Sequence, residues 1–161
     1  MHNVYIGIGT NIEPRLERIE QAIDSLSQLG SVEKKSSIYE TAPYGFTEQA
    51  KFLNAAVMLL TELELTPLHN ALKILENELG RTERQRWHER EIDFDILFYD
   101  DVIMDSGILT VPHKELQNRS FVLVPMNEIA SDLIHPEFQR DISSLVKELQ
   151  YDKDSIHLMK A

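Results

Sequence analysis

The order of extended and helical segments over the first hundred residues limits the folds open to this chain more than any other feature. Apolar and β-branched residues predict strands over residues 4–9, 32–40 and 92–99. Residues 52–63 are ambiguous, since their alanines favour a helix, but their valine and threonine and the flanking loops lead us to predict a strand. The resulting order predicts an α+β, ferredoxin-like βαββαβ core, in which an antiparallel sheet is flanked by helices.

Two predicted helices complete this core, and each has a buried stripe and signals at its ends. The first covers residues 13–29 and ends at Gly30. In the second, Thr66 is the expected cap, Pro67 the first helical position and Gly80 the stop. The two stripes consist of Leu16, Ile19, Ile23 and Leu26, and of Leu68, Leu72, Leu75 and Leu79.

The remaining third of the chain predicts additions to the core. A hairpin is expected to lead from the fourth strand through Asp100 and Asp101 into residues 102–104, followed by an extended piece at 109–111. The tail contains an apolar stretch at 121–125 and a late helix at 143–149. We therefore expect a C-terminal hairpin and helices beyond the βαββαβ unit.

Composition narrows the class of protein. The 161 residues fit one domain, 1–161. The absence of cysteine excludes disulfides and thiolate metal sites and fits a cytoplasmic location. The N-terminus lacks signal-peptide features, and no apolar run approaches the ~20 residues of a membrane helix, so no membrane partner is expected. The net charge of −11 argues against nucleic acid.

Two carboxylates in the fourth strand are the sharpest functional signal. Side chains alternate along a strand, so Asp93 and Asp95 share one face, while Phe94 and Ile96 share the other. Like charges on one face repel, and a hard cation such as Mg²⁺ removes the repulsion. Taken alone, the pair is equally well explained as a solvated acidic face.

An arginine-rich stretch leads directly into this strand. Residues 81–90 contain four arginines and two glutamates, a net charge of +2, and the only tryptophan, Trp87. Guanidinium groups bind phosphate in a bidentate manner. A charge run alone more often forms an exposed connector. Here its position before the aspartates favours a site in which arginines and Mg²⁺ meet one triphosphate.

Other segments are less specific by themselves. His113 could donate to a phosphate, but a single histidine is more often structural, and the remaining histidines are too scattered for a zinc site. The segment 7–11 lacks the third glycine of a dinucleotide fingerprint, so a structural turn is the better interpretation. Residues 41–45 and 52–54 could line a pocket for a flat ring, or form an ordinary turn and strand start.

Taken in order, these segments resemble the 6-hydroxymethyl-7,8-dihydropterin pyrophosphokinase family of folate biosynthesis. The resemblance runs from residue 4 to about 130, and its strength lies in the ordered set, since each segment is weak alone. The matching segments are Tyr5-Ile6-Gly7-Ile8-Gly9-Thr10-Asn11, Tyr39-Glu40-Thr41-Ala42-Pro43-Tyr44-Gly45, Phe52-Leu53-Asn54-Ala55, Arg86-Trp87, Arg90-Glu91-Ile92-Asp93-Phe94-Asp95-Ile96-Leu97, Thr110-Val111-Pro112-His113 and Asn118-Arg119-Ser120-Phe121-Val122-Leu123. Departures from the family pattern, such as His88-Glu89 where Gly-Pro is common, concern closure of the loop before the strand.

The resemblance implies a reaction and a set of roles. Pyrophosphate moves from ATP to the pterin hydroxymethyl oxygen, AMP leaves, and Asp93 and Asp95 bind two Mg²⁺ ions. The implied catalytic residues are Arg81, Arg90, Asp95 and His113. The implied ATP-binding residues are Glu76, Arg81, Arg84, Trp87, Arg90, Ile96, His113 and Arg119. The implied pterin-binding residues are Thr41, Pro43, Tyr44, Phe52, Asn54 and Phe121, with the two phenylalanines on either side of the ring.

The family further implies a monomer or weak homodimer, and the chain has no room for a second folate-pathway domain. Two other hypotheses remain at this point. One is a non-catalytic RNA-binding module on a ferredoxin-like sheet, which the net charge and the aspartates disfavour. The other is a plain interaction domain, in which Asp93 and Asp95 affect only stability.

Overall fold

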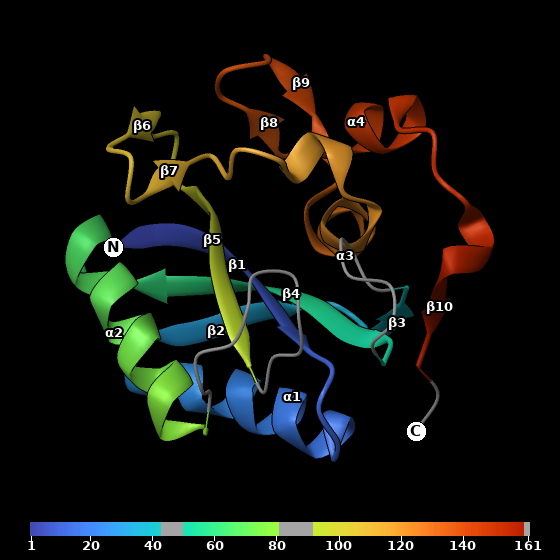
Figure 1. Cartoon of the computed structure of the whole chain (residues 1–161). Helices are drawn as coiled ribbons and strands as arrows, with labels where there is room; N and C mark the ends of the chain where they lie inside the picture. Colours follow the sequence, from blue (N-terminus) through green and yellow to red (C-terminus); the bar gives the residue numbers. More distant parts are fainter. Residues whose placement is uncertain (43–49, 81–91, 160–161) are drawn as a thin grey trace.

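A six-stranded antiparallel sheet forms the centre of the computed structural model, which describes residues 1–42, 50–80 and 92–159. The strand order is β10-β3-β4-β1-β5, and β2 also pairs with β4 (Figure 1). The strands are β1 (His2–Thr10), β2 (Ser31–Lys35), β3 (Tyr39–Thr41), β4 (Phe52–Thr61), β5 (Asp93–Tyr99) and β10 (Ile156–Leu158). The central pair β1–β4, with β5 and β2 outside it, is the arrangement of a ferredoxin-like core.

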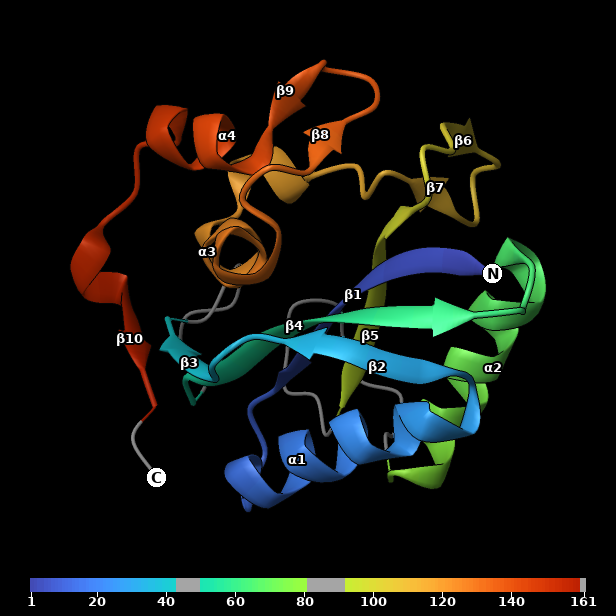
Figure 2. The same cartoon turned by 180° about the vertical axis from the view of Figure 1, so that it is seen from behind.

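Two helices cover one face of this sheet. They are α1 (Arg15–Ser25), extended by a 3-10 turn at Leu26–Gln28, and α2 (Leu65–Glu78). Figures 1 and 2 show both on the side of the sheet opposite α3. Alternate residues of β1, β4 and β5 point towards them, and the predicted stripe residues Ile19, Leu68 and Leu72 are buried between helices and sheet. This packing is the main core.

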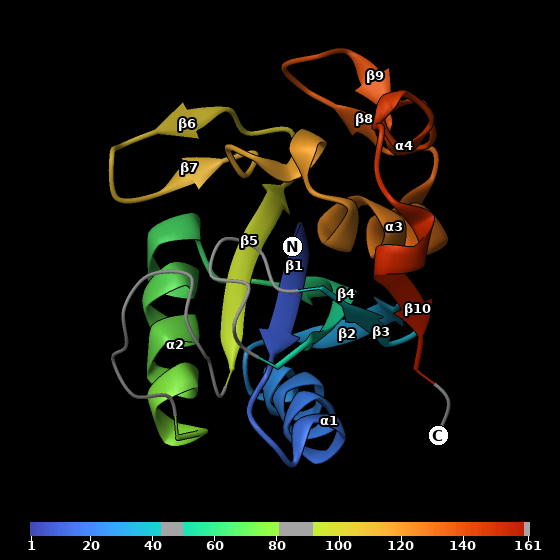
Figure 3. The same ribbon diagram turned by 45° about the vertical axis from the view of Figure 1, so that its right-hand side comes forward.

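The C-terminal part of the chain forms a second layer on the other face (Figure 3). It contains α3 (Ser120–Ala130) and α4 (Ile142–Glu148), with 3-10 turns at Leu116–Asn118 and Lys153–Ser155. The same part of the chain contains two small hairpins: β6 (Met104–Asp105) with β7 (Thr110–Val111) before α3, and β8 (Ile134–His135) with β9 (Arg140–Asp141) between α3 and α4. A second core forms where Ala56, Leu97 and Phe98 meet Leu123 and Met126 of α3.

The predicted fold class is confirmed, although the strand expected over residues 32–40 is divided. Between β2 and β3, the Ser36 hydroxyl accepts a hydrogen bond from the Ala56 amide at 2.9 Å, in place of a strand carbonyl. The Ser37 amide and hydroxyl then bind the Glu128 carboxylate of α3. These serine contacts turn the chain away from the β4 ladder and bring it back as β3, so one predicted strand becomes two.

The predicted hairpin between residues 92–99 and 102–104 is wrong. Asp100 adopts a positive φ of 47°, and its carboxylate binds the Asn3 amide and the His2 ring at the start of β1. The chain therefore turns at Asp100 without forming a returning strand, and Met104–Asp105 pairs with β7 instead. The apolar stretch at 121–125 becomes the first half of α3.

The helix ends differ slightly from those expected. The second helix begins at Leu65, so Thr66 and Pro67 lie in its first turn, and Glu64 occupies the cap position without a side-chain bond. The first begins at Arg15. The predicted late helix is α4. Within the described ranges, no helix combines the length and apolar character that a membrane crossing requires.

Gly30 provides a test of the packing between the end of the first helix and the sheet. A Cβ atom at Gly30 would lie 2.2 Å from the backbone carbonyl oxygen of Leu60 in β4. Because a backbone atom cannot move aside cheaply, we expect Gly30→Ala to lower the free energy of unfolding by about 1–3 kcal/mol. Urea unfolding measures this difference, and Ser31→Ala at the neighbouring exposed position is the control. Equal stability of the two variants would contradict the packing described.

Candidate active site

Two glycines of β1, Gly7 and Gly9, add no side chain to the second face of the sheet. Gly9 lies opposite Asn54 of β4 on one side and Asp93 of β5 on the other. Gly7 lies in the same way between Ala56 and Asp95. Residues directly opposite one another in an antiparallel pair share a face. The glycines therefore form a floor with carboxylates along one edge and an amide along the other.

The floor depends on the absence of a side chain at Gly9. A Cβ atom there would lie 2.9 Å from the Asn54 amide oxygen. That distance is too short for two atoms that do not hydrogen-bond, so Asn54 would have to shift. Glycine inside a strand weakens it and often marks the close approach of another group. The prediction of a structural turn at residues 7–11 is wrong for most of this segment, because β1 continues through Thr10.

The predicted acidic pair is found on one face of β5. Phe94 and Ile96 point into the main core, and the partly exposed Asp93 and Asp95 point to the floor. Burial and the charge of Asp93 raise the pKa of Asp95 to about 7, and Glu76 acts in the same direction, while Lys73 and Arg119 act against it. The site thus concentrates negative charge. Among the described residues, no group of three or more histidines and carboxylates could by itself hold a metal ion.

Glu76 supports this strand from behind. It lies on α2, is only 2% exposed, and its carboxylate accepts a hydrogen bond from the Phe94 amide at 2.7 Å. Lys73 lies 3.4 Å from its other oxygen. Within the described residues β5 is at the edge of the sheet, so the Phe94 amide faces no further strand there and binds Glu76 instead. The described contacts place Glu76 at the peptide between Asp93 and Asp95.

His113 and Arg119 reach the acidic pair from the second layer. The His113 amide donates to the Leu97 carbonyl at 2.9 Å, which fixes the segment beside β5. Its Nδ1 accepts from the Glu115 amide at 3.3 Å, so the neutral ring carries its proton on Nε2. Burial lowers the pKa of His113, as does the Arg119 charge, while Asp93 and Glu115 raise it. These residues therefore share one electrostatic environment.

Polar and aromatic residues lie on the other side of the glycine floor. The Asn54 amide nitrogen donates to the Thr41 hydroxyl at 2.6 Å, and both side chains are buried. Thr41 is paired with Phe52 at the start of β4, and Phe52 shares the face of Asn54. Phe121 is the second residue of α3, and the Arg119 guanidinium lies 5.8 Å from the centre of its ring. The structure therefore joins Thr41, Phe52 and Asn54 into one group.

Some of the predicted site residues cannot be compared with the structure. Those that lie outside the described residues are Pro43, Tyr44, Arg81, Arg84, Trp87 and Arg90. Ile96 is described, but its side chain is buried in the main core, away from Asp95. The predicted role of Ile96 in ATP binding stays a prediction. Lys73, whose charge acts on Asp95, was not predicted, because a lysine on a helix gives no distinct sequence signal.

The sequence from residue 5 to residue 131 matches the family model described as 7,8-dihydro-6-hydroxymethylpterin-pyrophosphokinase. The chain is 38% identical over 148 residues to the 2-amino-4-hydroxy-6-hydroxymethyldihydropteridine pyrophosphokinase of Aquifex aeolicus, which covers 92% of both chains. It is 40% identical over 150 residues to the protein of the same name from Haemophilus influenzae, which covers 92% of this chain and 93% of that protein.

The fold of this chain is also similar to that of solved structures. One, described as a crystal structure analysis of HPPK-DHPS in complex with substrates, matches with a TM-score of 0.71 and 16% sequence identity. The match covers 91% of this chain and 43% of the solved chain, so this chain corresponds to less than half of that protein. A likeness at this identity concerns the fold alone.

The raised pKa of Asp95 predicts that the acidic pair lowers the free energy of unfolding by an amount that depends on pH. A carboxyl group with a folded-state pKa of about 7, against an ordinary value of 3.8, destabilises the fold progressively as pH rises from about 4 to about 7. With EDTA present, we compare the free energy of unfolding of Asp95→Asn with that of the unchanged protein. The advantage of the variant should be larger at pH 8 than at pH 5 by roughly 1–3 kcal/mol. Chemical denaturation at both pH values measures this gain. The surface variant Asp132→Asn is the control, and an equal pH response of both variants would disprove the repulsion.

Proposed function

The chain belongs to the 7,8-dihydro-6-hydroxymethylpterin-pyrophosphokinase family, as its ordered motifs predict, and from that premise we propose how its residues carry out the reaction. The enzyme transfers pyrophosphate from ATP to the hydroxymethyl group of 6-hydroxymethyl-7,8-dihydropterin in folate synthesis. The hydroxymethyl oxygen forms a bond to the β-phosphorus, the bond from that phosphorus to the α-phosphate oxygen breaks, and AMP leaves. The hydroxyl proton is released.

Asp93 and Asp95 are proposed to hold Mg²⁺, with two ions present when ATP is bound. The raised pKa of Asp95 supports this assignment, because burial and the nearby charge of Asp93 both disfavour its carboxylate, and a divalent cation would offset both effects. Mg²⁺ is usually bound by one or two carboxylates together with water and substrate phosphates, so a pair of carboxylates suits it. When bound, the ions neutralise charge on the phosphates and on the group being transferred.

His113 and Arg119 are proposed to bind phosphate oxygens beside the acidic pair. A neutral His113 with its proton on Nε2 is a donor, and the guanidinium of Arg119 carries a permanent positive charge. Phosphoryl transfer depends mainly on positioning and charge neutralisation, which these groups supply. Arg81, Arg84, Arg90 and Trp87 are proposed to complete the ATP site from the segment before β5. Glu76 contributes by holding the Phe94 peptide, which supports the strand that carries both aspartates.

The pterin is proposed to bind at the end of the glycine floor near Asn54. The hydrogen bond to Thr41 fixes the orientation of the Asn54 amide, so its oxygen and its second N–H are available to the polar edge of a heterocycle. Phe52 and Phe121 are proposed to enclose the ring, since stacked aromatic rings attract one another. Pro43 and Tyr44 are proposed to line the same pocket. Because Gly7 and Gly9 carry no side chain, a flat ring bound there would lie close to the carboxylates of Asp93 and Asp95.

The remaining expectations concern partners and location. We propose that the enzyme acts in the cytoplasm as a monomer or weak homodimer on its two small substrates, without nucleic acid or membrane. The alternative of a non-catalytic RNA-binding module is set aside, because the family model and the curated relatives identify a pyrophosphokinase.

The product formed from ATP tests the reaction. With ATP, Mg²⁺ and 6-hydroxymethyl-7,8-dihydropterin, we expect AMP in equal amount to the pterin diphosphate. No AMP should appear without the pterin or with excess EDTA, since the first removes the acceptor and the second the ions. Chromatography of the nucleotides separates the outcomes. Formation of ADP in place of AMP would contradict transfer at the β-phosphorus.

Asp95→Ala tests the metal assignment. Loss of this carboxylate should reduce kcat by about 10²-fold or more, because an interaction that stabilises the transition-state charge is removed. The circular dichroism spectrum should be unchanged, since Asp95 lies outside both cores. Asp132→Ala on the surface should retain full turnover. An Asp95→Ala enzyme that keeps most of its turnover would remove this residue from the metal site.

A further inference from the structure

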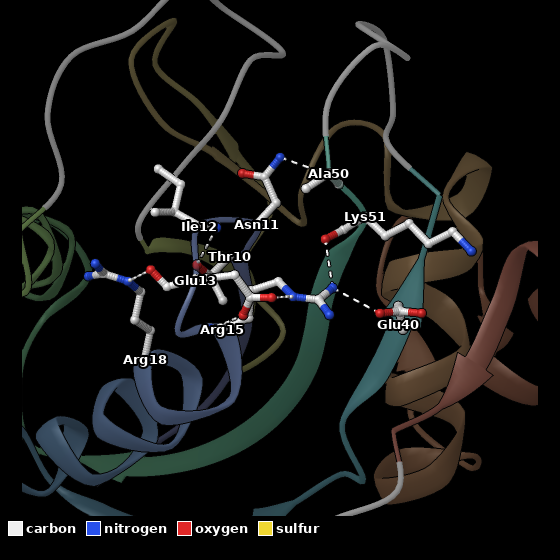
Figure 4. A network of polar contacts seen from close by, with 9 residues as sticks. All are labelled: Thr10, Asn11, Ile12, Glu13, Arg15, Arg18, Glu40, Ala50 and Lys51. Carbon is white, nitrogen blue, oxygen red and sulfur yellow. Dashed lines mark hydrogen bonds and ion pairs between the residues drawn. The ribbon is translucent and has the colours of Figure 1, made fainter.

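Arg15 connects three parts of the chain behind the proposed pterin site. It is the first residue of α1, and its guanidinium extends to β3 and to the start of β4 (Figure 4). Resting on the proposed function, we propose that Arg15 is a positioning residue for pterin binding. It fixes the spacing of the strand ends that carry Thr41 and Phe52, and it touches neither substrate.

The contacts of Arg15 use several of its donors at once. Nη1 lies 2.9 Å from a Glu40 carboxylate oxygen and donates to the Lys51 carbonyl at 3.0 Å. Nε lies 3.2 Å from the Glu13 carboxylate. The Arg15 side chain is only 15% exposed and that of Glu40 27% exposed, so solvent screens these contacts less than it screens a surface ion pair. One planar group therefore joins α1, β3 and β4.

The residues that Arg15 holds are the immediate neighbours of the proposed pterin residues. Glu40 precedes Thr41 in β3, and Lys51 precedes Phe52, the first residue of β4. Thr41 and Phe52 are paired across the two strands, and Thr41 also binds Asn54. A change in the spacing between Glu40 and Lys51 is therefore passed directly to all three pterin residues.

Arg15 acts from the opposite side of the sheet. Glu40 is paired with Leu53, which is buried in the main core beneath α1, whereas Thr41 and Asn54 point to the other face. Side chains alternate along a strand, so the ion pair of Arg15 with Glu40 lies on the helix side. This separation means that any effect of Arg15 on pterin affinity is transmitted through the strands.

Two of the strands at this corner are short, so side-chain contacts add to the backbone pairing that holds their spacing. β3 has three residues, and its outer neighbour β10 has three as well. A second side chain from the same segment assists: Asn11 donates to the Ala50 carbonyl at 3.1 Å, next to the carbonyl that Arg15 binds (Figure 4). The two consecutive carbonyls are thus held by side chains from the β1–α1 connection. Such preorganisation lowers the cost of ordering a site when its ligand binds.

Substitution of Arg15 separates this role from general stability. In Arg15→Gln, we expect KM for the pterin to rise about tenfold, since the strand ends must be ordered by the ligand itself. KM for ATP should stay within about twofold, because the proposed phosphate residues lie on other elements. Arg15→Lys keeps the charge but not the planar fork, so it should fall between Gln and Arg. Steady-state kinetics with each substrate varied in turn measures both constants.

Arg18→Gln is the matched control on the same helix. The Arg18 side chain has one described hydrogen bond, from Nε to the Glu13 carbonyl at 3.4 Å, and it does not contact β3 or β4 in that bond. Its pterin KM should equal that of the unchanged enzyme. An unchanged pterin KM in Arg15→Gln, or an equal rise in both KM values, would overturn the proposed role.

Glu40→Gln gives a second, milder test, because Arg15 keeps its bonds to Lys51 and Glu13. Glu40→Gln should raise the pterin KM by less than Arg15→Gln. The double variant should resemble Arg15→Gln alone, because both substitutions remove the same ion pair between Arg15 and Glu40. Additive effects would contradict the coupling. Failure of the unchanged enzyme to form AMP would reject the proposed function and this role together, whereas normal AMP formation with unaffected variants would reject only the role of Arg15.

Discussion

Two glycines in β1, set between β4 and β5, keep β1 side chains out of the region where we propose that the substrates bind. The same strand contributes Val4, Ile6 and Ile8 to the main core on its other side, so β1 supports stability on one face and function on the other. The second layer covers the far end of that functional face through Leu97, Phe98 and α3. Gly7 and Gly9 add no side chain to that face, and Asp93, Asp95 and Asn54 border them. The proposed site therefore lies where β1 carries no side chains.

Repulsion between Asp93 and Asp95 destabilises this edge of the sheet, and a hydrogen bond from the helix side supports the strand that carries them. Asp93 and Asp95 repel one another on β5, which is an edge strand in the part of the chain that the structure describes. Glu76 reaches through the main core to bind the peptide between them, so the strand is held although its outer face carries like charges. The binding of Glu76 brings a third carboxylate near the pair, and it too raises the pKa of Asp95. Support of the strand and concentration of negative charge are thus achieved by one side chain.

Patterns that rest on local periodicity could be predicted from the sequence, and those that rest on long-range contacts could not. The stripe of Leu68, Leu72 and Leu75 predicted α2, and the alternation around Phe94 predicted which face the aspartates occupy. The division of β2 from β3 depends on Ser36 and Ser37 finding Ala56 and Glu128, which no local pattern announces. The false hairpin after β5 has the same origin, since Asp100 binds the start of β1. The resemblance places Glu76 in the site, whereas its hydrogen bond with the Phe94 amide is a long-range contact that no sequence pattern predicts.

Charged side chains from the helix side of the sheet support the strands at both ends of the proposed site. Glu76 comes from α2 to the β5 edge, and Arg15 comes from α1 to the β3–β4 corner. Each is a charged side chain on the helix face that binds a backbone group of a strand whose ligand-facing residues lie on the other side. A side chain on the functional face would occupy the space that a ligand needs. Placing the supporting charges on the helix face keeps that space open, so the two helices contribute to the site as well as to the main core.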